Sequence, residues 1–127
     1  MGRGRIVCAL AAAVIAGCQP AFDSVDLVAV STPPVEVTVR DFLVELPAGT
    51  AVVVATVPRS GNRHDYDDET VVDLVSDDPD VMDVFGRPTA REFVLVGIDA
   101  GETCLRVHID GMVRDCIDVV VEPPAAD

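Results

Sequence analysis

The chain contains no lysine and no tryptophan, and it has only one tyrosine and four phenylalanines. Its 22 acidic residues outnumber its 9 arginines, which gives a formal net charge of −13 at pH 7. This excess of negative charge argues against nucleic acid as a partner and against electrostatic attachment to anionic membranes. Because the apolar content rests on Val and Ala rather than on aromatic residues, it favours thin β-sheet packing over a large apolar binding cleft.

Motifs of covalent and metal catalysis are missing as well. No Gly-x-Ser-x-Gly nucleophile elbow occurs, and neither His64 nor His108 has a neighbour at the spacing of zinc ligands. A catalytic cysteine would have to come from a pair, Cys104 and Cys116, that is better explained as a disulfide. We therefore expect neither enzyme activity nor a cofactor.

Residues 1–17 have the pattern of a cleaved export signal that forms a short helix. Arg3 and Arg5 provide the positive start, and the uncharged run after them is too short to span a bilayer as a helix. The alternatives are an ordinary secretory leader and a plain signal anchor. Removal of the leader takes the formal net charge from −13 to −15, because two arginines leave with it.

The end of this leader, Ile15-Ala16-Gly17-Cys18, resembles the lipobox of bacterial lipoproteins. In that family the cysteine receives the lipid, including palmitate, and becomes the new N-terminus. The resemblance implies that Cys18 is lipidated, that Cys8 leaves with the leader, and that the protein is anchored in the cell envelope. Because Gln19 is not an aspartate, the resemblance points to the outer membrane or the cell surface, and it leaves open whether the protein faces the periplasm.

Four segments are expected along the chain. Residues 1–17 form the signal peptide, and residues 18–34 form the lipidated N-terminus and a tether that is rich in Pro and Ser. An apolar run over 25–30 interrupts this tether and could pair as an edge strand. The folded domain is expected over 35–122, and residues 123–127 form a C-terminal tail.

Alternating apolar residues and β-branched runs, separated by turn residues, predict a series of short strands. The expected strands cover residues 35–40 with an extension over 42–46, then 50–57, 71–75, 81–85 and 92–96, and finally two strands around Asp110-Gly111. No helical period of about ten residues appears after the leader. The pattern predicts an all-β, immunoglobulin-like antiparallel β-sandwich of about seven strands.

The last two strands can be assigned to faces residue by residue. Leu105, Val107 and Ile109 share one face of the first strand, because side chains alternate along a strand. Val113 and Ile117 lie on one face of the second strand. We expect these two apolar faces to coincide and to face the core.

The register between these strands predicts a disulfide. A three-residue loop over 109–111 keeps the apolar faces together and places Cys104 directly opposite Cys116, whereas a two-residue turn mixes the faces and is disfavoured. An exported protein is in a compartment that permits this bond. The same register places Arg106 opposite Arg114, which is a slightly unfavourable pair of like charges.

Turn and core residues of the chain resemble the group 2 bacterial immunoglobulin-like domain. They are Pro47-Ala48-Gly49-Thr50, residues 76–84, residues 97–103 and the valine-rich last strand, in the usual order of that family. The resemblance covers residues 35–121. It implies a module used in surface adhesins and envelope proteins, either as a rigid spacer or as a binder of carbohydrate or protein.

Residues 58–69 have no hydrophobic period and predict a long exposed loop. The length and polarity of this loop exceed what a connector needs, so it is a candidate for binding a partner. Its candidate contact residues are Arg63, His64, Asp65, Tyr66, Asp67 and Asp68. A second candidate surface is the outward face around Arg106, His108 and Arg114.

Three side chains of this loop, Asp65, Asp67 and Glu69, supply the hard oxygen ligands that calcium prefers. They are weak candidates, because the segment lacks the glycine and the distal glutamate of a helix-loop-helix calcium site. A solvated loop without metal is the favoured interpretation.

These observations together predict a non-enzymatic, lipid-anchored envelope protein with a single immunoglobulin-like domain that acts as an interaction or structural module. Its partner is expected to be another envelope protein or a glycan. The alternative is a loop-based binder of a glycan or a protease, inhibitor-like in action, with or without the help of calcium.

Overall fold

The computed structural model describes residues 19–31, 36–40, 42–87 and 90–124. The expected signal peptide and Cys18 lie outside the described residues. The strands are β1 (Phe22–Ala29), β2 (Thr38–Arg40), β3 (Leu43–Pro47), β4 (Ala51–Ser60), β5 (Val72–Ser76), β6 (Met82–Arg87), β7 (Glu92–Gly97), β8 (Gly101–Ile109) and β9 (Met112–Glu122). In this part of the chain, no helix is both long enough and apolar enough to cross a membrane.

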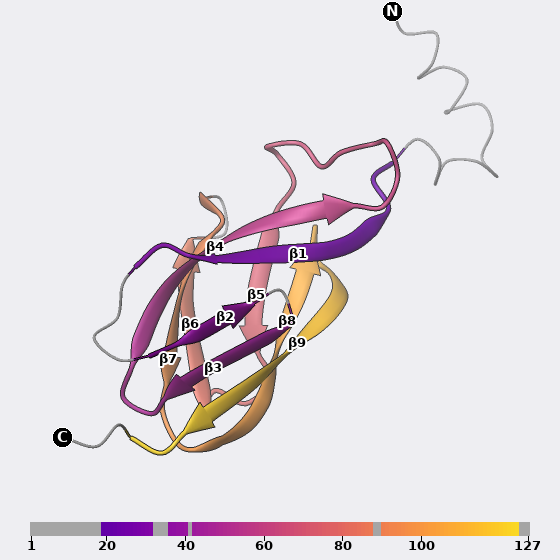
Figure 1. The fold of residues 1–127 in the computed structure, drawn as a ribbon. Coiled ribbons are helices and arrows are strands. Elements are labelled where there is room, and N and C mark those ends of the chain that lie inside the picture. The colour runs from indigo at the N-terminus through magenta and orange to yellow at the C-terminus, as the bar shows by residue number, and fades with distance from the viewer. Residues whose placement is uncertain (1–18, 32–35, 41, 88–89, 125–127) are drawn as a thin grey trace, which may run out of the picture.

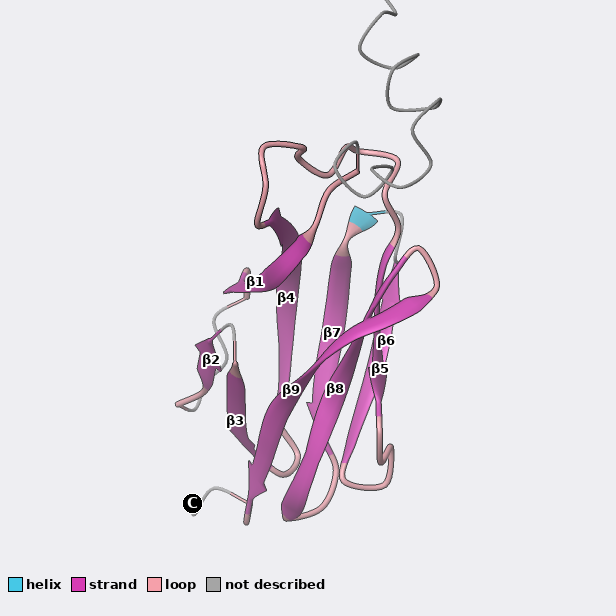
Figure 2. Cartoon of the chain, turned by 90° about the vertical axis from the view of Figure 1, so that its right-hand side faces the viewer, coloured by secondary structure: helices cyan, strands magenta, loops and turns pink. Residues whose placement is uncertain are grey.

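The strands form two sheets that pack face to face (Figure 1, Figure 2). One sheet has the order β1-β4-β7-β6, and the other has the order β2-β3-β9-β8-β5. Neighbouring strands are antiparallel except for β3 and β9, which are parallel. The predicted all-β sandwich is confirmed, with nine strands among the described residues and one parallel pair.

The apolar run inside the expected tether is a full strand of the sandwich. β1 pairs antiparallel with β4 at the edge of its sheet, as the run over 25–30 indicated. Val25 and Leu27 are only 0% and 5% exposed, because their side chains enter the core. The sandwich therefore begins at Phe22, and not at residue 35, where the sequence placed its start.

The core lies between the two sheets and follows the alternation of the strands. Val52 and Val54 of β4 pair with Leu95 and Phe93 of β7, and all four side chains are buried. Each large apolar side chain that is buried in this way contributes about 1.5–3 kcal/mol. The largest fully buried side chains are Phe93, Leu46, Met82, Leu95, Leu105 and Ile117.

The turn between β8 and β9 is shorter than predicted. Asp110 and Gly111 alone connect the strands, and Ile109 pairs with Met112. Both turn residues are left-handed, with φ of 49° and 86°, and a turn of this kind matches the twist of a hairpin. The predicted three-residue loop over 109–111 is therefore wrong.

β9 contains one extra residue close to this turn, and this bulge realigns the strands. His108 pairs with Val113 and Val107 pairs with Asp115, so Arg114 has no partner in the register. An extra residue shifts the alternation of side chains by one position, so the residues before a bulge face the side opposite to the one that simple alternation predicts. Val113 is accordingly 51% exposed and does not share the buried face of Ile117, contrary to the prediction.

The disulfide between Cys104 and Cys116 is present, with their Cα atoms 5.5 Å apart. The predicted direct opposition of the two cysteines is wrong, because Cys104 pairs with Asp118 and Cys116 pairs with Arg106. The bond therefore crosses the hairpin diagonally. The expected pair of Arg106 and Arg114 does not form, because the bulge removes Arg114 from the register.

Candidate functional site

The loop between β4 and β5, residues 61–71, is called the acidic loop below. It begins later than predicted, because β4 continues through Pro58 to Ser60. Pro58 pairs with Val25 of β1, whereas the pairing of β4 with β7 ends at Ala55. A proline is tolerated in a strand where one side of the backbone needs no ladder partner.

Asn62 organises the first turn of the acidic loop. Its Oδ1 atom accepts hydrogen bonds from the hydroxyl of Ser60 and from the backbone N–H of His64, both at 2.8 Å. Its Nδ2 atom donates to the backbone carbonyl of Gln19 at 2.9 Å. One amide side chain thus holds the loop in shape and attaches it to the chain that precedes β1.

Two further hydrogen bonds fix that preceding segment. The N–H of Gly61 donates to the carbonyl of Ala21 at 2.6 Å, and the N–H of Ala21 donates to the hydroxyl of Ser60 at 3.2 Å. Residues 19–21 are therefore attached to the acidic loop rather than forming a free tether.

The second half of the acidic loop is held by Asp67 and Arg91. Asp67 Oδ1 accepts hydrogen bonds from the N–H groups of Glu69 and Thr70, each at 3.0 Å, and from the hydroxyl of Thr70 at 3.1 Å. Arg91, which has a left-handed φ of 55°, donates to the carbonyls of Asp67 and Thr70 at 2.5 and 2.9 Å. The guanidinium thereby connects the loop to the start of β7.

The end of the acidic loop is bound to the β8–β9 turn. Asp110 Oδ1 accepts a hydrogen bond from the N–H of Val71 at 2.9 Å, and the N–H of Asp110 donates to the carbonyl of Val71 at 2.8 Å. The acidic loop, the hairpin turn and residues 19–21 consequently lie together at one end of the sandwich.

Tyr66 lies in the middle of the acidic loop and packs half-buried against the hydrophobic core. Burial raises the pKa of its phenol above the ordinary value of 10.0, since the phenolate would lose hydration. The guanidinium of Arg114 opposes this rise in the pKa, and the carboxylate of Asp110 adds to it. The phenol is therefore a neutral hydrogen-bonding group at neutral pH.

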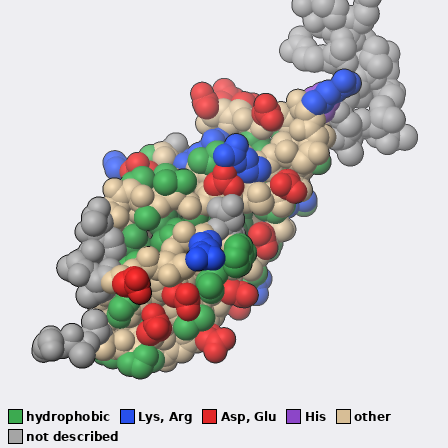
Figure 3. Space-filling model, viewed as in Figure 1, with side chains coloured by type: hydrophobic (Ala, Val, Ile, Leu, Met, Phe, Trp, Pro, Cys, Tyr) green, Lys and Arg blue, Asp and Glu red, His purple; other side chains and the backbone are tan. Residues whose placement is uncertain are grey.

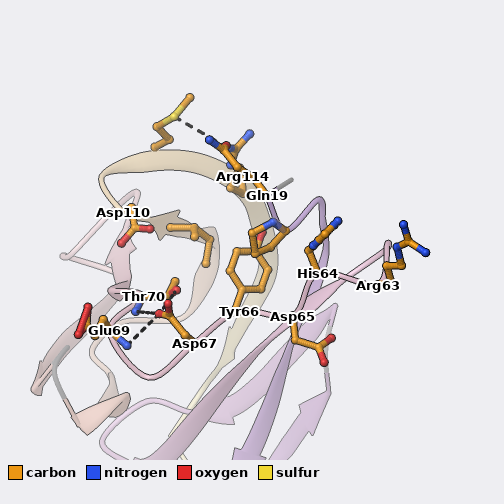
Figure 4. A pocket seen from close by; sticks show the side chains of 13 residues that line it. Gln19, Arg63, His64, Asp65, Tyr66, Asp67, Glu69, Thr70, Asp110 and Arg114 are labelled. Atoms are coloured by element: carbon orange, nitrogen blue, oxygen red, sulfur yellow. Dashed lines mark hydrogen bonds between the residues drawn. The ribbon is translucent and has the colours of Figure 1, made fainter. Parts of the chain in front are cut away.

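These elements enclose an open groove of about 840 Å³ (Figure 4). Five of the six predicted contact residues line it, and Asp68 does not. The lining residues are Gln19, Pro20, Arg63, His64, Asp65, Tyr66, Asp67, Glu69, Thr70, Ile109, Asp110, Met112 and Arg114. The groove combines a single aromatic ring with side chains of both charges, and it is the candidate functional site.

The second predicted surface, around Arg106, His108 and Arg114, is divided in the structure. Arg106 forms an ion pair with Asp77 at 2.8 Å on the outward face of β8. Arg114 lines the groove instead, and His108 lies between them, opposite Val113. The three side chains therefore do not act as one basic patch.

The weak calcium candidates Asp65, Asp67 and Glu69 all line the groove. Within the described ranges, however, no group of three or more His, Cys, Asp or Glu side chains is placed to hold a metal ion. Asp67 directs a carboxylate oxygen to backbone N–H groups of its own loop. Its role in this arrangement is to build the turn.

Three residues that shape the site were not predicted to belong to it: Gln19, Asn62 and Arg91. Asn62 carried a local signal, since asparagine after Ser-Gly commonly bonds to the backbone two residues further on. Gln19 and Arg91 carried none, because the segments that they contact are distant in the sequence.

No protein-family model and no curated protein sequence matches the chain. The resemblance to the group 2 bacterial immunoglobulin-like domain therefore stays a prediction.

Two similar solved structures both come from the surface-layer protein SbsC. Its domains 4 and 5 have a TM-score of 0.53 at 15% identity, and the match covers 72% of this chain and 54% of that one. A structure of its domains 1–6 has a TM-score of 0.55 at 11% identity, and the match covers 85% of this chain and 14% of that one. The chain thus corresponds to a part of these larger proteins, and at this identity the likeness concerns the fold.

Proposed function

We propose that this protein is a non-enzymatic, lipid-anchored component of the cell envelope whose single immunoglobulin-like domain acts as a structural or interaction module. The observation that carries this proposal is the lipobox-like sequence that ends at Cys18, together with the attachment of Gln19 and Ala21 to the acidic loop. Cys18, whose context resembles a lipobox, directly precedes these fixed residues. A lipid on this cysteine would hold the folded domain at the membrane with almost no free chain between them.

The use of the polar side chains in the groove supports a non-enzymatic role. Asp67 and Asp110, which line the groove, and Asn62, which lies outside its lining, all direct side-chain oxygens to N–H groups of the loop or its neighbours. Groups that are engaged in building turns are poorly available as an acid, a base or a nucleophile. A likeness in fold to domains of a surface-layer protein is compatible with a structural task at the cell surface.

The test is fractionation of cells that produce the wild type, Cys18→Ala and, as a matched control, Cys8→Ala. We expect the wild type and the Cys8 variant to stay with the membranes and to incorporate a palmitate analogue. The Cys18 variant should lose the label and leave the membrane fraction. Equal membrane association and equal labelling of all three proteins would refute lipid anchoring at Cys18.

The groove supports a second candidate function, the binding of a glycan by the acidic loop. Tyr66 offers an aromatic ring beside carboxylates and the guanidinium of Arg114, which are groups that can bind sugar hydroxyls. A glycan array with the wild type and Tyr66→Ala tests it. Binding that is lost in the variant supports the candidate, and the absence of binding by the wild type rejects it.

A further inference from the structure

We propose that the end of the sandwich with the acidic loop rests on the bilayer surface, with Arg63, His64 and Arg114 facing anionic headgroups. This inference depends on the proposed lipid anchor at Cys18 and adds an orientation to it. The opposite end of the sandwich then becomes the surface that is presented to other envelope components.

Very little chain is available as a spacer between a lipid on Cys18 and the folded domain. Gln19 is held by Asn62, and Ala21 is held by Gly61. Consecutive Cα atoms are about 3.8 Å apart, so Cys18 lies one such step from a residue that is fixed to the domain. A lipid on that cysteine would leave almost no chain over which the domain could move away from the membrane.

Basic side chains line the groove next to this attachment point. Arg63, His64 and Arg114 line the same groove as Gln19, although that groove is also lined by Asp65, Asp67, Glu69 and Asp110 and the protein as a whole is strongly acidic. Among the described residues, neither of these arginines forms an ion pair with a carboxylate. Basic side chains without a carboxylate partner are attracted to anionic headgroups at short range.

Asp67 and Glu69 of the acidic loop lie apart from these basic side chains, and Asp65 lies among them. In Figure 4, Arg114 is drawn next to Gln19 and Asp65 lies next to His64, whereas Asp67 and Glu69 lie on the other side of the groove. Figure 3 shows Arg and His side chains together at one end of the visible face, whereas Asp and Glu side chains are spread over the rest of it. The side nearest the anchor is therefore the more basic one.

Apolar side chains are exposed near Gln19. Met112 and Val113, at the start of β9, are 58% and 51% exposed. Val113 and Arg114 also line a second hollow of about 470 Å³ together with Gln19. Exposed apolar side chains beside basic ones are typical of surfaces that lie in the membrane interface.

The shape of the domain fixes the position of the other end. Figure 1 shows the start of β1 and the end of β9 toward opposite ends of the sandwich. β4 has 10 residues and runs along much of this length, which corresponds to about 33 Å at ~3.3 Å per residue. The turns over 48–50, 77–81 and 98–100 would then stand roughly 30 Å above the headgroups.

Because the chain has no tryptophan, a single introduced one reports its own distance from the membrane. We would place it at Met112 (Met112→Trp) or, as the distal control, at Ile98 (Ile98→Trp), which is 43% exposed. The full lipidated protein is reconstituted into phosphatidylethanolamine and phosphatidylglycerol vesicles that contain a lipid with a nitroxide on its headgroup. We expect several-fold stronger quenching for Met112→Trp than for Ile98→Trp.

Charge reversal tests the role of the basic residues. In the Met112→Trp background, Arg63→Glu together with Arg114→Glu should reduce the quenching, because headgroup attraction is replaced by repulsion. Arg40→Glu, on the exposed edge strand β2, is the control and should leave the quenching unchanged. An equal loss of quenching in the double variant and in Arg40→Glu would contradict a contact of Arg63 and Arg114 with the headgroups.

Different results would refute the lipid anchor at Cys18 and the orientation of the domain on the membrane. Protein that sits in the vesicle fraction with equal quenching at both tryptophans overturns the orientation alone, and the groove is then free for a partner such as a glycan. Protein that is not lipidated and does not enter the vesicle fraction overturns both the anchor and the orientation. Thermal melts of both tryptophan variants establish that the sandwich is folded in each.

Discussion

The side-chain amide of Asn62 donates a hydrogen bond to the backbone carbonyl of Gln19, across 43 residues of sequence. The same side chain accepts hydrogen bonds from Ser60 and His64. One residue therefore contributes both to the first turn of the acidic loop and to the position of the chain next to Cys18. A change at Asn62 should affect both.

Replacing Asn62 by Ala should lower the free energy of unfolding by about 1 kcal/mol, since several partly exposed hydrogen bonds are lost. Hydrogen exchange at the N–H of Gly61, which donates to Ala21, should become faster. Asn62→Asp retains the acceptor oxygen for Ser60 and His64 but loses the donor to Gln19. Compared with Asn62→Ala, it should keep the shape of the loop but not its attachment to Gln19. Unchanged exchange in Asn62→Ala would show that the attachment does not depend on this side chain.

Removing the disulfide, by Cys104→Ala with Cys116→Ala, should lower the free energy of unfolding by about 3 kcal/mol. The bond closes a short loop, with a sequence separation of 12. Because the hairpin already holds the two strands together, the loss should not exceed this value. Chemical denaturation with and without reductant measures the effect. Reductant should destabilise the wild type and leave the stability of the double variant unchanged. Alkylation of both cysteines in the wild type without prior reduction would show that the disulfide is absent.

Gly86→Ala should destabilise the sandwich by about 1–3 kcal/mol, because the added methyl group has no space. A Cβ atom at this position would lie 2.2 Å from Cδ2 of Phe93 and 3.0 Å from the carbonyl of Glu92. The ring of Phe93 is 1% exposed and is enclosed by the core. Urea denaturation measures the loss.

Gly61→Ala is the matched control for this change. Its added Cβ would lie 3.6 Å from the nearest atom, which is an ordinary contact with Asp23. Its stability should stay within about 0.5 kcal/mol of the wild type. Equal stability of the two glycine variants would contradict the packing of Phe93 against Gly86.

The raised pKa of Tyr66 predicts a loss of stability at high pH. The folded state favours the neutral phenol, so this contribution is complete below pH 10.0, the ordinary pKa, and is lost as the pH rises through the higher pKa of the folded state. No lysine titrates in this range, and Tyr66 is the sole tyrosine. The near-ultraviolet absorbance of the tyrosinate therefore measures its pKa directly.

Tyr66→Phe provides the control for the pH dependence. Its denaturation midpoint should fall less than that of the wild type as the pH is raised above 10.0, because no phenol can ionise. Parallel curves for the two proteins, together with a tyrosinate transition at the ordinary pKa, would show that burial does not shift this group.

The sequence predicted the strands well where alternation was regular. Leu105, Val107 and Ile109 are buried as expected, because their pattern persists along the whole strand. The register beyond the turn was wrong, since alternation cannot reveal an extra residue such as Arg114. The predicted disulfide is nevertheless confirmed, because Cys104 and Cys116 are also close enough to bond when they lie diagonally across the hairpin.

The site was predictable only in part. Loop composition identified Arg63, His64 and Tyr66, which do line the groove. Loop composition could not show that residues 19–21 complete the groove, because hydrogen bonds to the distant Asn62 and Gly61 bring them there. The groove thus arises from tertiary contacts that no local pattern encodes.

The central claim is that a lipid on Cys18 places the domain directly on the membrane. Mass spectrometry of the N-terminal peptide from the membrane fraction tests it most directly. We predict a peptide that begins at Cys18, followed by Gln19, and that carries the mass of attached acyl chains. A mature protein that begins at any other residue, with Cys18 unmodified, would contradict the account.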